Sequence, residues 1–541
     1  MFLFNSLTAY IKRELYFKLN PWTIVSLIIC FLIFSPIFII IINFNIQTEN
    51  WAHIKEYLLL KYIFSSSLLV IGVGLISTII GVGCAWIVTC YNFHGKRLIE
   101  WTLLLPMTVP TYIVAYSYYD ILELFNPLFI WSRKNIGIKY TLIFDEFLVF
   151  FIVIILFSFV LYPYIYISTR ASLMLQGNRL VEAANMLGYK SSSIFFKVIL
   201  PMIKPAIAAG LSLVVMETLN DYAAVEYFGI STLTIGIFRS WFGMNDISSA
   251  LKISAFLVLF ILLILVLERL ARGQEKYFNR TGAPNELIKI NLSLKDTIKA
   301  LLFCVIPVVF GFIFPVTRQL IWLFYSDFSA IDKNIFNITI NTISISFFSC
   351  IMIVIIAFTI NFVKSYFGND ILKKFGQLAI LGYSMPGAII GIGILKLNGY
   401  ISQSYTIIIT GTVFGLIFAY IIRFLAVAWQ PIESSMEKQC ASINQTSRFL
   451  SKSTQQAMFK VNIPILKKTL LLTCLIVFVD IMKELPLTLI LRPFNFDTLS
   501  TLTYDLINQA QFFQSSLSSL LIIFISLPII LFVSSQIKEE N

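Results

Sequence analysis

Long apolar runs separated by short polar segments dominate this chain. A helix that crosses a bilayer needs about 20 consecutive, mostly apolar residues, and twelve runs approach or exceed that length. The runs lie near residues 22–45, 62–90, 99–122, 147–170, 205–228, 250–268, 298–324, 337–363, 376–396, 404–428, 468–491 and 515–536. Some runs are marginal: 99–122 contains two prolines, and 205–228 carries Glu217 and Asp221 among its acids. The pattern predicts an all-α polytopic membrane protein with about twelve transmembrane helices, and at least ten.

Composition and charge fix the environment and the orientation. Of the 541 residues, 58% are hydrophobic and 13% are charged, which excludes a soluble globule and leaves membrane lipid as the surrounding medium. Placing both termini in the cytoplasm puts most lysines and arginines on the cytoplasmic side, as the positive-inside rule requires. The net charge of +12 mainly reflects this bias, so we expect no nucleic-acid partner. No small-residue cleavage site follows the first apolar run, so we expect that run to be retained.

The chain is organised in two related halves. A polar stretch from Glu268 to Lys299 separates two sets of about six runs. We therefore predict a first half at 1–275, a cytoplasmic linker at 276–297 and a second half at 298–541. Segments 105–116 and 382–391 support a duplication, because each places a proline inside an apolar run. A membrane bundle tolerates such a proline as a kink when its neighbours satisfy the freed carbonyl.

A basic loop near 176–204 has the features of a docking element. An alanine-rich segment favours a short helix, a glycine permits a sharp turn, and a proline starts the next helix. The residues concerned are Glu182, Ala183, Ala184, Gly188, Leu200 and Pro201. Two helices joined at a glycine make a rigid knob for a cytoplasmic partner. The alternative is an amphipathic loop without a docking role.

The second half has a degenerate copy of this loop near 429–467. When Pro464 is set on the proline of the first loop, Ile463 takes the position of the preceding leucine. Gln445, Ser447 and Ser451 then replace the acid, the second alanine and the glycine. We therefore predict two unequal knobs, the second of which contacts its partner differently or more weakly.

Acidic residues recur at matched positions in the two halves. Glu217 and Asp480 each lie sixteen residues after the loop proline of their half, and Asp221 and Glu484 follow four residues later. On a continuous helix this spacing places each pair on one face. A buried carboxylate is costly, so the four acids are candidates for lining a path for a cationic substrate. The alternative is that they hold helices together, with Lys483 neutralising one of them.

The sequence lacks the residues of an enzyme or an ATPase. It contains no phosphate-binding loop, no catalytic triad-like set, no metal-ligand spacing among its seven cysteines, and only two histidines. We expect no covalent chemistry, no bound cofactor and no firm metal site in this chain. If transport is active, ATP must be hydrolysed by a separate partner subunit.

Four segments of the chain resemble ABC importer permeases. The first loop resembles the Glu-Ala-Ala loop of ABC importer permeases, whose knob fits a groove on the ATPase subunit. Segments 216–229, 234–244 and 478–499 are similar to the fused iron(III) ABC transporter permeases of bacteria. The resemblance covers nearly the whole chain, although it is patchy before residue 60 and at 295–333.

The resemblance implies a fold, partners and a cargo. The fold would be that of a type I ABC importer permease in the bacterial inner membrane. A periplasmic binding protein would deliver Fe(3+), and a pair of cytoplasmic ABC ATPase subunits would use ATP. Related permeases carry thiamine, polyamines, sulfate or phosphonates, and the loop motifs do not separate these cargoes. A secondary transporter is a weaker alternative, since it has no reason to carry two such loops.

Overall fold

The computed structural model is almost entirely helical. It describes residues 20–43, 49–186, 191–272, 290–326, 334–368, 372, 376, 382, 385–405, 409–439, 443–444, 446–447 and 453–539. Within these residues, nine helices are long and apolar enough to cross a membrane. The count is ten if the bent pair Lys96–Thr108 and Thr111–Ser117, which meets at 91°, is one span. The all-α polytopic fold is therefore confirmed.

Two of the expected spans that differ from the prediction lie in the second half. The run 376–396 appears as α18 (Gly387–Tyr405), and the run 468–491 is divided between α22 (Ile463–Met482) and α23 (Pro486–Leu491). Hydropathy alone does not reveal such a division, because the residues on both sides of the break are apolar. Among the described residues, neither α18 nor α22 meets the length and polarity required of a continuous span.

The chain forms two compact units whose composition differs from the two sequence halves. Unit 1 contains residues 1–46 and 333–501, and unit 2 contains residues 47–332 and 502–541. The first helix therefore packs with second-half helices, and the last helix belongs to the unit that contains most of the first half. The predicted division at 276–297 concerns repetition along the sequence and stays a prediction; most of that linker lies outside the described residues.

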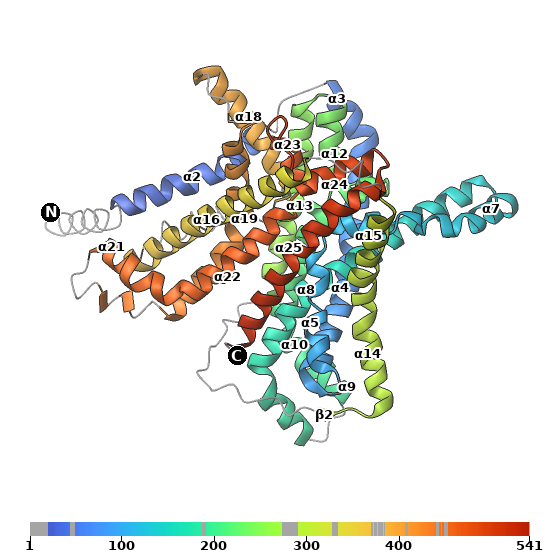
Figure 1. The fold of residues 1–541 in the computed structure, drawn as a ribbon, viewed down its shortest axis with the longest axis horizontal. Helices are drawn as coiled ribbons and strands as arrows, with labels where there is room; N and C mark the ends of the chain where they lie inside the picture. The colour runs from blue at the N-terminus through green and yellow to red at the C-terminus, as the bar shows by residue number, and fades with distance from the viewer. Residues whose placement is uncertain are drawn as a thin grey trace, which may run out of the picture. The chain divides into compact units, whose positions relative to one another are not determined.

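Unit 1 is built on three long helices packed against one another: α16 (Ile335–Phe367), α19 (Val413–Gln439) and α22 (Figure 1). Helix α2 (Pro21–Ile42) packs on α16, α18 and α19. Asn20 caps α2 by accepting the amide of Thr23 at 2.9 Å, and Pro21 stands in the first turn, where no amide donor is needed. Trp429, Phe362 and Tyr420 are fully buried between these helices.

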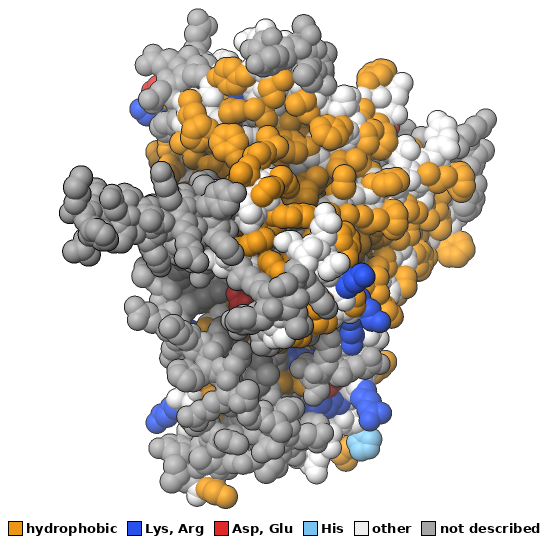
Figure 2. All heavy atoms as spheres, turned by 90° about the vertical axis from the view of Figure 1, so that its left-hand side faces the viewer, with side chains coloured by type: hydrophobic (Ala, Val, Ile, Leu, Met, Phe, Trp, Pro, Cys, Tyr) orange, Lys and Arg blue, Asp and Glu red, His pale blue; other side chains and the backbone are white. Residues whose placement is uncertain are grey.

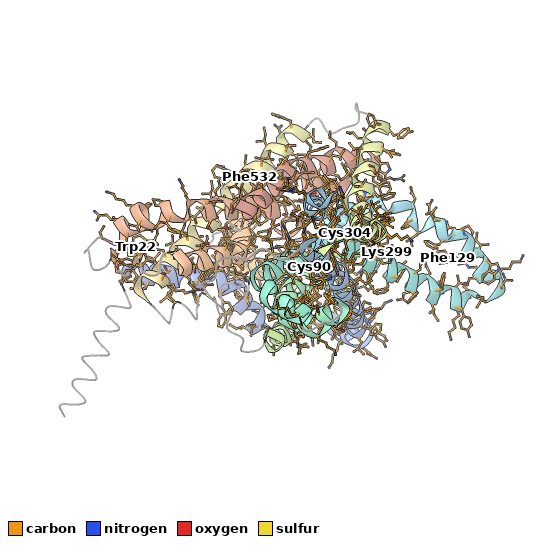
Figure 3. All side chains as sticks on the ribbon, turned by 90° about the horizontal axis from the view of Figure 1, so that it is seen from below. Trp22, Cys90, Phe129, Lys299, Cys304 and Phe532 are labelled. Atoms are coloured by element: carbon orange, nitrogen blue, oxygen red, sulfur yellow. The ribbon has the colours of Figure 1, made fainter. Side chains whose placement is uncertain are left out.

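Unit 2 is built around α4 (Leu59–Cys90), α8 (Ile138–Met186) and α10 (Leu200–Asn220). Small residues allow close packing: a Cβ at Gly210 would lie 2.7 Å from the Cα of Ile165. Helices α13 (Ile247–Arg272), α14 (Leu294–Val308), α15 (Phe314–Tyr325) and α25 (Phe512–Glu539) complete the unit. Helix α7 (Asn126–Asn135) and the start of α8 form a projecting hairpin (Figure 1), and Figure 3 shows Phe129 on it, away from Cys90 and Cys304.

Short elements connect these helices. The short α-helices are α3 (Glu49–His53), α5 (Lys96–Thr102), α6 (Thr111–Ser117), α9 (Ser191–Ile194), α11 (Ala223–Tyr227), α12 (Leu233–Phe238), α21 (Thr454–Ala457) and α24 (Leu499–Asn508). The 3₁₀ turns are η3 (Leu105–Thr108), η4 (Tyr119–Ile121) and η5 (Glu123–Phe125). The π-helical turns are η2 (Ile54–Leu58), η6 (Phe195–Ile199), η7 (Arg239–Gly243), η8 (Val309–Ile313) and η11 (Met458–Asn462). Strands β1 (Tyr91–Asn92) and β2 (Ile290–Asn291) form one short parallel pair.

The surface has the polarity expected of a membrane protein. Figure 2 shows hydrophobic side chains over a broad area of one face, with lysine and arginine side chains gathered beyond its edge. On α2 alone, Phe31 is 61% exposed and Ile42 is 60% exposed. A soluble monomer rarely exposes an apolar surface of this extent, whereas lipid tails cover it without cost.

Candidate functional site

The first predicted docking loop follows a very long helix. Residues 182–184 belong to the last turns of α8, which runs without interruption from Ile138 to Met186. The expectation of a separate short helix was therefore wrong, because α8 continues past Pro163 and Gly177 into this segment. Gly188 lies outside the described residues, as do 187 and 189–190. After them, α9 and η6 lead into α10, where Pro201 is the second residue and is exposed.

The second loop reaches its helix in the same way. Gln445 and Ser451 lie outside the described residues, whereas Ser447 is buried in unit 1. Helix α21 and the π-helical turn η11 lead into α22, whose second residue is the exposed Pro464. A proline lacks the amide that would close the preceding helical turn, and in both loops a π-helical turn stands immediately before this position. The docking roles of both loops stay predictions.

An asparagine network that the sequence did not reveal holds the second loop. Asn462 donates to Asn444 Oδ1 at 2.9 Å and to the carbonyl of Ala457 at 3.0 Å. Asn444 in turn donates to Ser365 Oγ on α16 at 3.1 Å. These hydrogen bonds connect the loop to the membrane helices of unit 1. Such a connection is needed if a partner that docks on the loop is to move those helices.

The helix before each predicted docking loop forms an ion pair with a neighbouring helix. Counting back from the two loop prolines makes Arg170 on α8 and Glu433 on α19 equivalent positions with opposite charge. Arg170 pairs with Glu100 at 3.3 Å, and Glu433 accepts from Lys364 of α16. Glu433 also accepts from the indole of Trp429 at 3.1 Å. Each unit therefore has an ion pair at this position, although the aligned residue is basic in unit 2 and acidic in unit 1.

The acids do not lie along continuous helices. Helix α10 ends at Asn220 and α22 ends at Met482, so Asp221 and Glu484 stand in the breaks that follow. The expectation that each acid pair shares a helix face was therefore wrong. The physical reason is capping: each second acid satisfies amide groups at the start of the next short helix, α11 or α23, which a continuous helix would not need.

In unit 2, Asp221 fixes the first break. Asp221 is 8% exposed, and its Oδ1 accepts the amide of Ala224 at 2.9 Å. Its other oxygen accepts the hydroxyl of Thr111. Thr111 directly follows Pro110 and begins α6, which packs on α11. The proline-containing segment singled out in the first half is thus the partner of this acid.

In unit 1, Glu484 fixes the second break in the equivalent way. Its Oε1 accepts the amide of Leu487 at 3.0 Å, and its Oε2 accepts Nε of Arg423 at 3.0 Å. Both ion-paired side chains are buried, with 3% and 4% exposure. Arg423 also donates to the carbonyl of Met385 at 2.8 Å. A Cβ added at Gly387 would lie only 2.6 Å from Glu484 Oε1, so glycine leaves the carboxylate its space.

The two breaks are copies of one arrangement with different partners. Pro386 and Gly387 correspond to Pro110 and Thr111, and α18 packs on α23 as α6 packs on α11. Val160 stands at the position equivalent to Arg423 when the loop prolines are aligned. The acid is therefore held by an arginine in unit 1 and by a threonine hydroxyl in unit 2. Sequence reasoning missed Arg423, although a lone charge inside the run 404–428 signals a buried partner.

The other two acids are less enclosed. Glu217 is half-buried on α10, and its carbonyl accepts the amide of Asp221 at 3.1 Å. Asp480 lies 3.7 Å from Nζ of Lys483, with side-chain exposures of 25% and 15%. Lys483 therefore lies close enough to form the expected ion pair with Asp480. That the four acids line a translocation path stays a prediction.

The chain is similar in sequence to known transport proteins. Residues 77–278 match the family described as binding-protein-dependent transport system inner membrane component. The Fe(3+)-transport system permease protein FbpB 2 of Haemophilus influenzae is 24% identical over 457 residues, 84% of this chain and 85% of that protein. A probable sulfate transport system permease protein, cysT of Prototheca wickerhamii, is 25% identical over 248 residues, 43% of this chain and 94% of that protein. The sulfate transport system permease protein CysT of Escherichia coli is 27% identical over 150 residues, 28% of this chain and 51% of that protein.

Proposed function

We propose that this chain is an inner-membrane permease of the binding-protein-dependent ABC transporter family and that it forms the membrane path of an importer for Fe(3+). A periplasmic binding protein would deliver the ion, and separate ATPase subunits would supply the energy. The observation that carries the proposal is the similarity to the Fe(3+) permease, which extends over 84% of this chain and 85% of that protein. A relative that matches most of both chains is a better guide to the function of the whole chain than a relative that matches only one half of it.

Sulfate is the second candidate, because several relatives are sulfate permeases. The longer of these matches cover 41% and 43% of this chain. An oxyanion needs positive or amide donors, whereas the two helix breaks place buried acids at equivalent positions. The arginine at one break, Arg423, already pairs with Glu484. Fe(3+) is a hard cation that prefers oxygen ligands, so the half-buried carboxylate of Glu217 suits iron better than sulfate.

The partners follow from the loops and the topology. We infer that two copies of an ATPase subunit dock at 176–204 and 429–467, and that both termini face the cytoplasm. The ion pairs and the asparagine network support this arrangement, since a docking loop must be stiff to transmit ATPase closure to the membrane helices. The two loops differ in sequence, so the two contacts would be unequal.

Uptake by intact cells tests the cargo. Cells that lack this gene, and the same cells complemented with it, would be given radiolabelled ferric iron or radiolabelled sulfate. We expect complementation to restore iron uptake and to leave sulfate uptake unchanged. Restored sulfate uptake without any change in iron uptake would overturn the iron assignment and favour the oxyanion.

A further inference from the structure

Three oxygen-bearing side chains converge in unit 2, just beyond the first helix break. Tyr222 follows the capping acid, Glu226 lies on α11, and Tyr504 lies on α24. The Tyr222 hydroxyl donates to Glu226 Oε1 at 2.6 Å, and the Tyr504 hydroxyl donates to Oε2 at 2.7 Å. The two phenol oxygens are 3.2 Å apart. Sequence reasoning overlooked this cluster, because Tyr504 is far from the other two residues along the chain.

The two phenols are held by independent packing. The ring of Tyr222 stacks on Phe238 of α12 with centroids 3.7 Å apart, and Tyr222 is 6% exposed. On α24, Thr503 and Ser518 of α25 share a hydrogen bond of 2.7 Å, which fixes the helix that carries Tyr504. Glu226 itself is exposed. The rings are therefore oriented from the protein side, while the carboxylate remains open to an ion that arrives from solvent.

Phenolate and carboxylate oxygens are hard ligands, and tyrosine binds ferric iron in known proteins. We propose that Tyr222, Glu226 and Tyr504 form a transient site for a hard trivalent cation, Fe(3+), on its way into the membrane path. On binding, each phenol loses its proton to solvent and its oxygen bonds the metal, so one Fe(3+) enters and two protons leave. The carboxylate of Glu226 supplies a third oxygen, and water fills the remaining coordination positions. This inference rests on the proposed function, because it assigns a contact to the same cargo.

Three protein ligands suit passage better than storage. Conduction requires a site that binds strongly enough to admit the ion and weakly enough to release it. Without iron, the same three side chains bond one another, so the oxygens are already gathered. The competing interpretation is a purely structural link between α11 and α24, and the two differ in whether the phenols contact iron.

Visible absorption distinguishes an iron site from a structural link between α11 and α24, because phenolate bound to Fe(3+) gives a charge-transfer band that a hydrogen-bonded phenol lacks. The purified full-length chain in lipid nanodiscs would be titrated with ferric citrate. We expect a band that saturates, that is lost in the double variant Tyr222→Phe with Tyr504→Phe, and that needs at least about tenfold more iron in Glu226→Gln. Tyr400→Phe is the matched control: its hydroxyl donates to the neutral Asn43 Oδ1 at 2.8 Å, so the band should persist.

The results of these measurements can overturn the iron site without overturning the proposed function, and the reverse. Phenylalanine keeps the ring packing, so the double variant should reach wild-type abundance and unfold at the wild-type temperature. A wild-type chain without a band at saturating ferric citrate, or a double variant with an undiminished band, would overturn the site. Iron uptake that continues at the wild-type rate in the double variant would also overturn it, while leaving the proposed function intact. A band in a chain that imports no iron would support the site and overturn the cargo.

Discussion

At the scale of single residues, the two capping acids occupy equivalent positions but are expected to contribute different amounts to the free energy of unfolding. Glu484 and Arg423 form a buried ion pair, whereas the position equivalent to Arg423 is Val160 in unit 2. Removing one partner of a buried pair leaves the other charge uncompensated, which costs more than losing a neutral hydrogen bond. The acids were visible in the sequence, but their partners come from distant segments and depend on the fold.

Charge removal at the two acids should therefore have unequal effects. Glu484→Gln keeps an oxygen for the amide of Leu487 but strands Arg423, so we expect a loss of about 3–5 kcal/mol in the free energy of unfolding. Asp221→Asn keeps an oxygen for the amide of Ala224 and should cost about 1 kcal/mol. Chemical unfolding of both variants in the same detergent checks this order. Equal losses would show that the buried ion pair adds nothing beyond the cap.

At the scale of elements, the helix breaks are the features that hydropathy concealed. The apolar runs 205–228 and 468–491 appeared continuous, yet each divides at its second acid. A signal was present in the second run, since an acid shortly before Pro486 is typical of a helix start. In the first run, no proline or glycine marks the break after Asn220. The loop prolines and the repeated proline segments, in contrast, could be identified from sequence spacing. Proline restricts the backbone locally, so its effect does not depend on contacts with distant segments.

The glycine beside the second break offers a sharp test of its packing. In Gly387→Ala the new Cβ would meet Glu484 Oε1 at 2.6 Å and Leu487 Cβ at 2.9 Å, so we expect lower thermal stability and lower membrane abundance. Gly399→Ala lies on the same helix with no atom within 4 Å, and it should be neutral or slightly stabilising. Comparable unfolding temperatures for the two variants would mean that the break relaxes at little cost.

The docking loops are predicted to be unequal elements. Glu182→Ala should weaken ATPase binding by more than about 1 kcal/mol, roughly fivefold in affinity, whereas Gln445→Ala should have a smaller effect. The reason is that only the first loop retains the acid and the glycine of the family pattern. Titration of the purified ATPase onto each variant in nanodiscs measures both affinities. If the two substitutions weaken binding equally, the degeneracy of the second loop has no functional meaning.

At the scale of the whole molecule, each compact unit draws helices from both sequence halves. Unit 1 needs α2 from the beginning of the chain, and unit 2 needs α14, α15 and α25 from beyond the linker. The repetition of the two halves was visible in the sequence. This exchange of helices between the two halves was not visible, because hydropathy indicates that a helix is present but not which helices lie next to it.

Splitting the chain tests this exchange. Residues 1–275 expressed alone would lack α14, α15 and α25, and residues 298–541 expressed alone would lack α2. We expect both fragments to be degraded when expressed separately and to accumulate when expressed together, because each buries the apolar faces of the other. Pulse-chase labelling of the fragments measures their lifetimes. Long lifetimes for both fragments expressed singly would contradict the exchange.

The central claim is that this chain conducts Fe(3+) when separate subunits hydrolyse ATP. The most direct measurement is iron entry into proteoliposomes that contain this chain and its ATPase, with a ferric chelator inside and the ferric-loaded binding protein outside. We expect chelated iron to accumulate only when ATP, the ATPase and the binding protein are all present, and sulfate not to accumulate under the same conditions. Iron entry that is independent of ATP, or ATP-driven sulfate entry without iron entry, would contradict it.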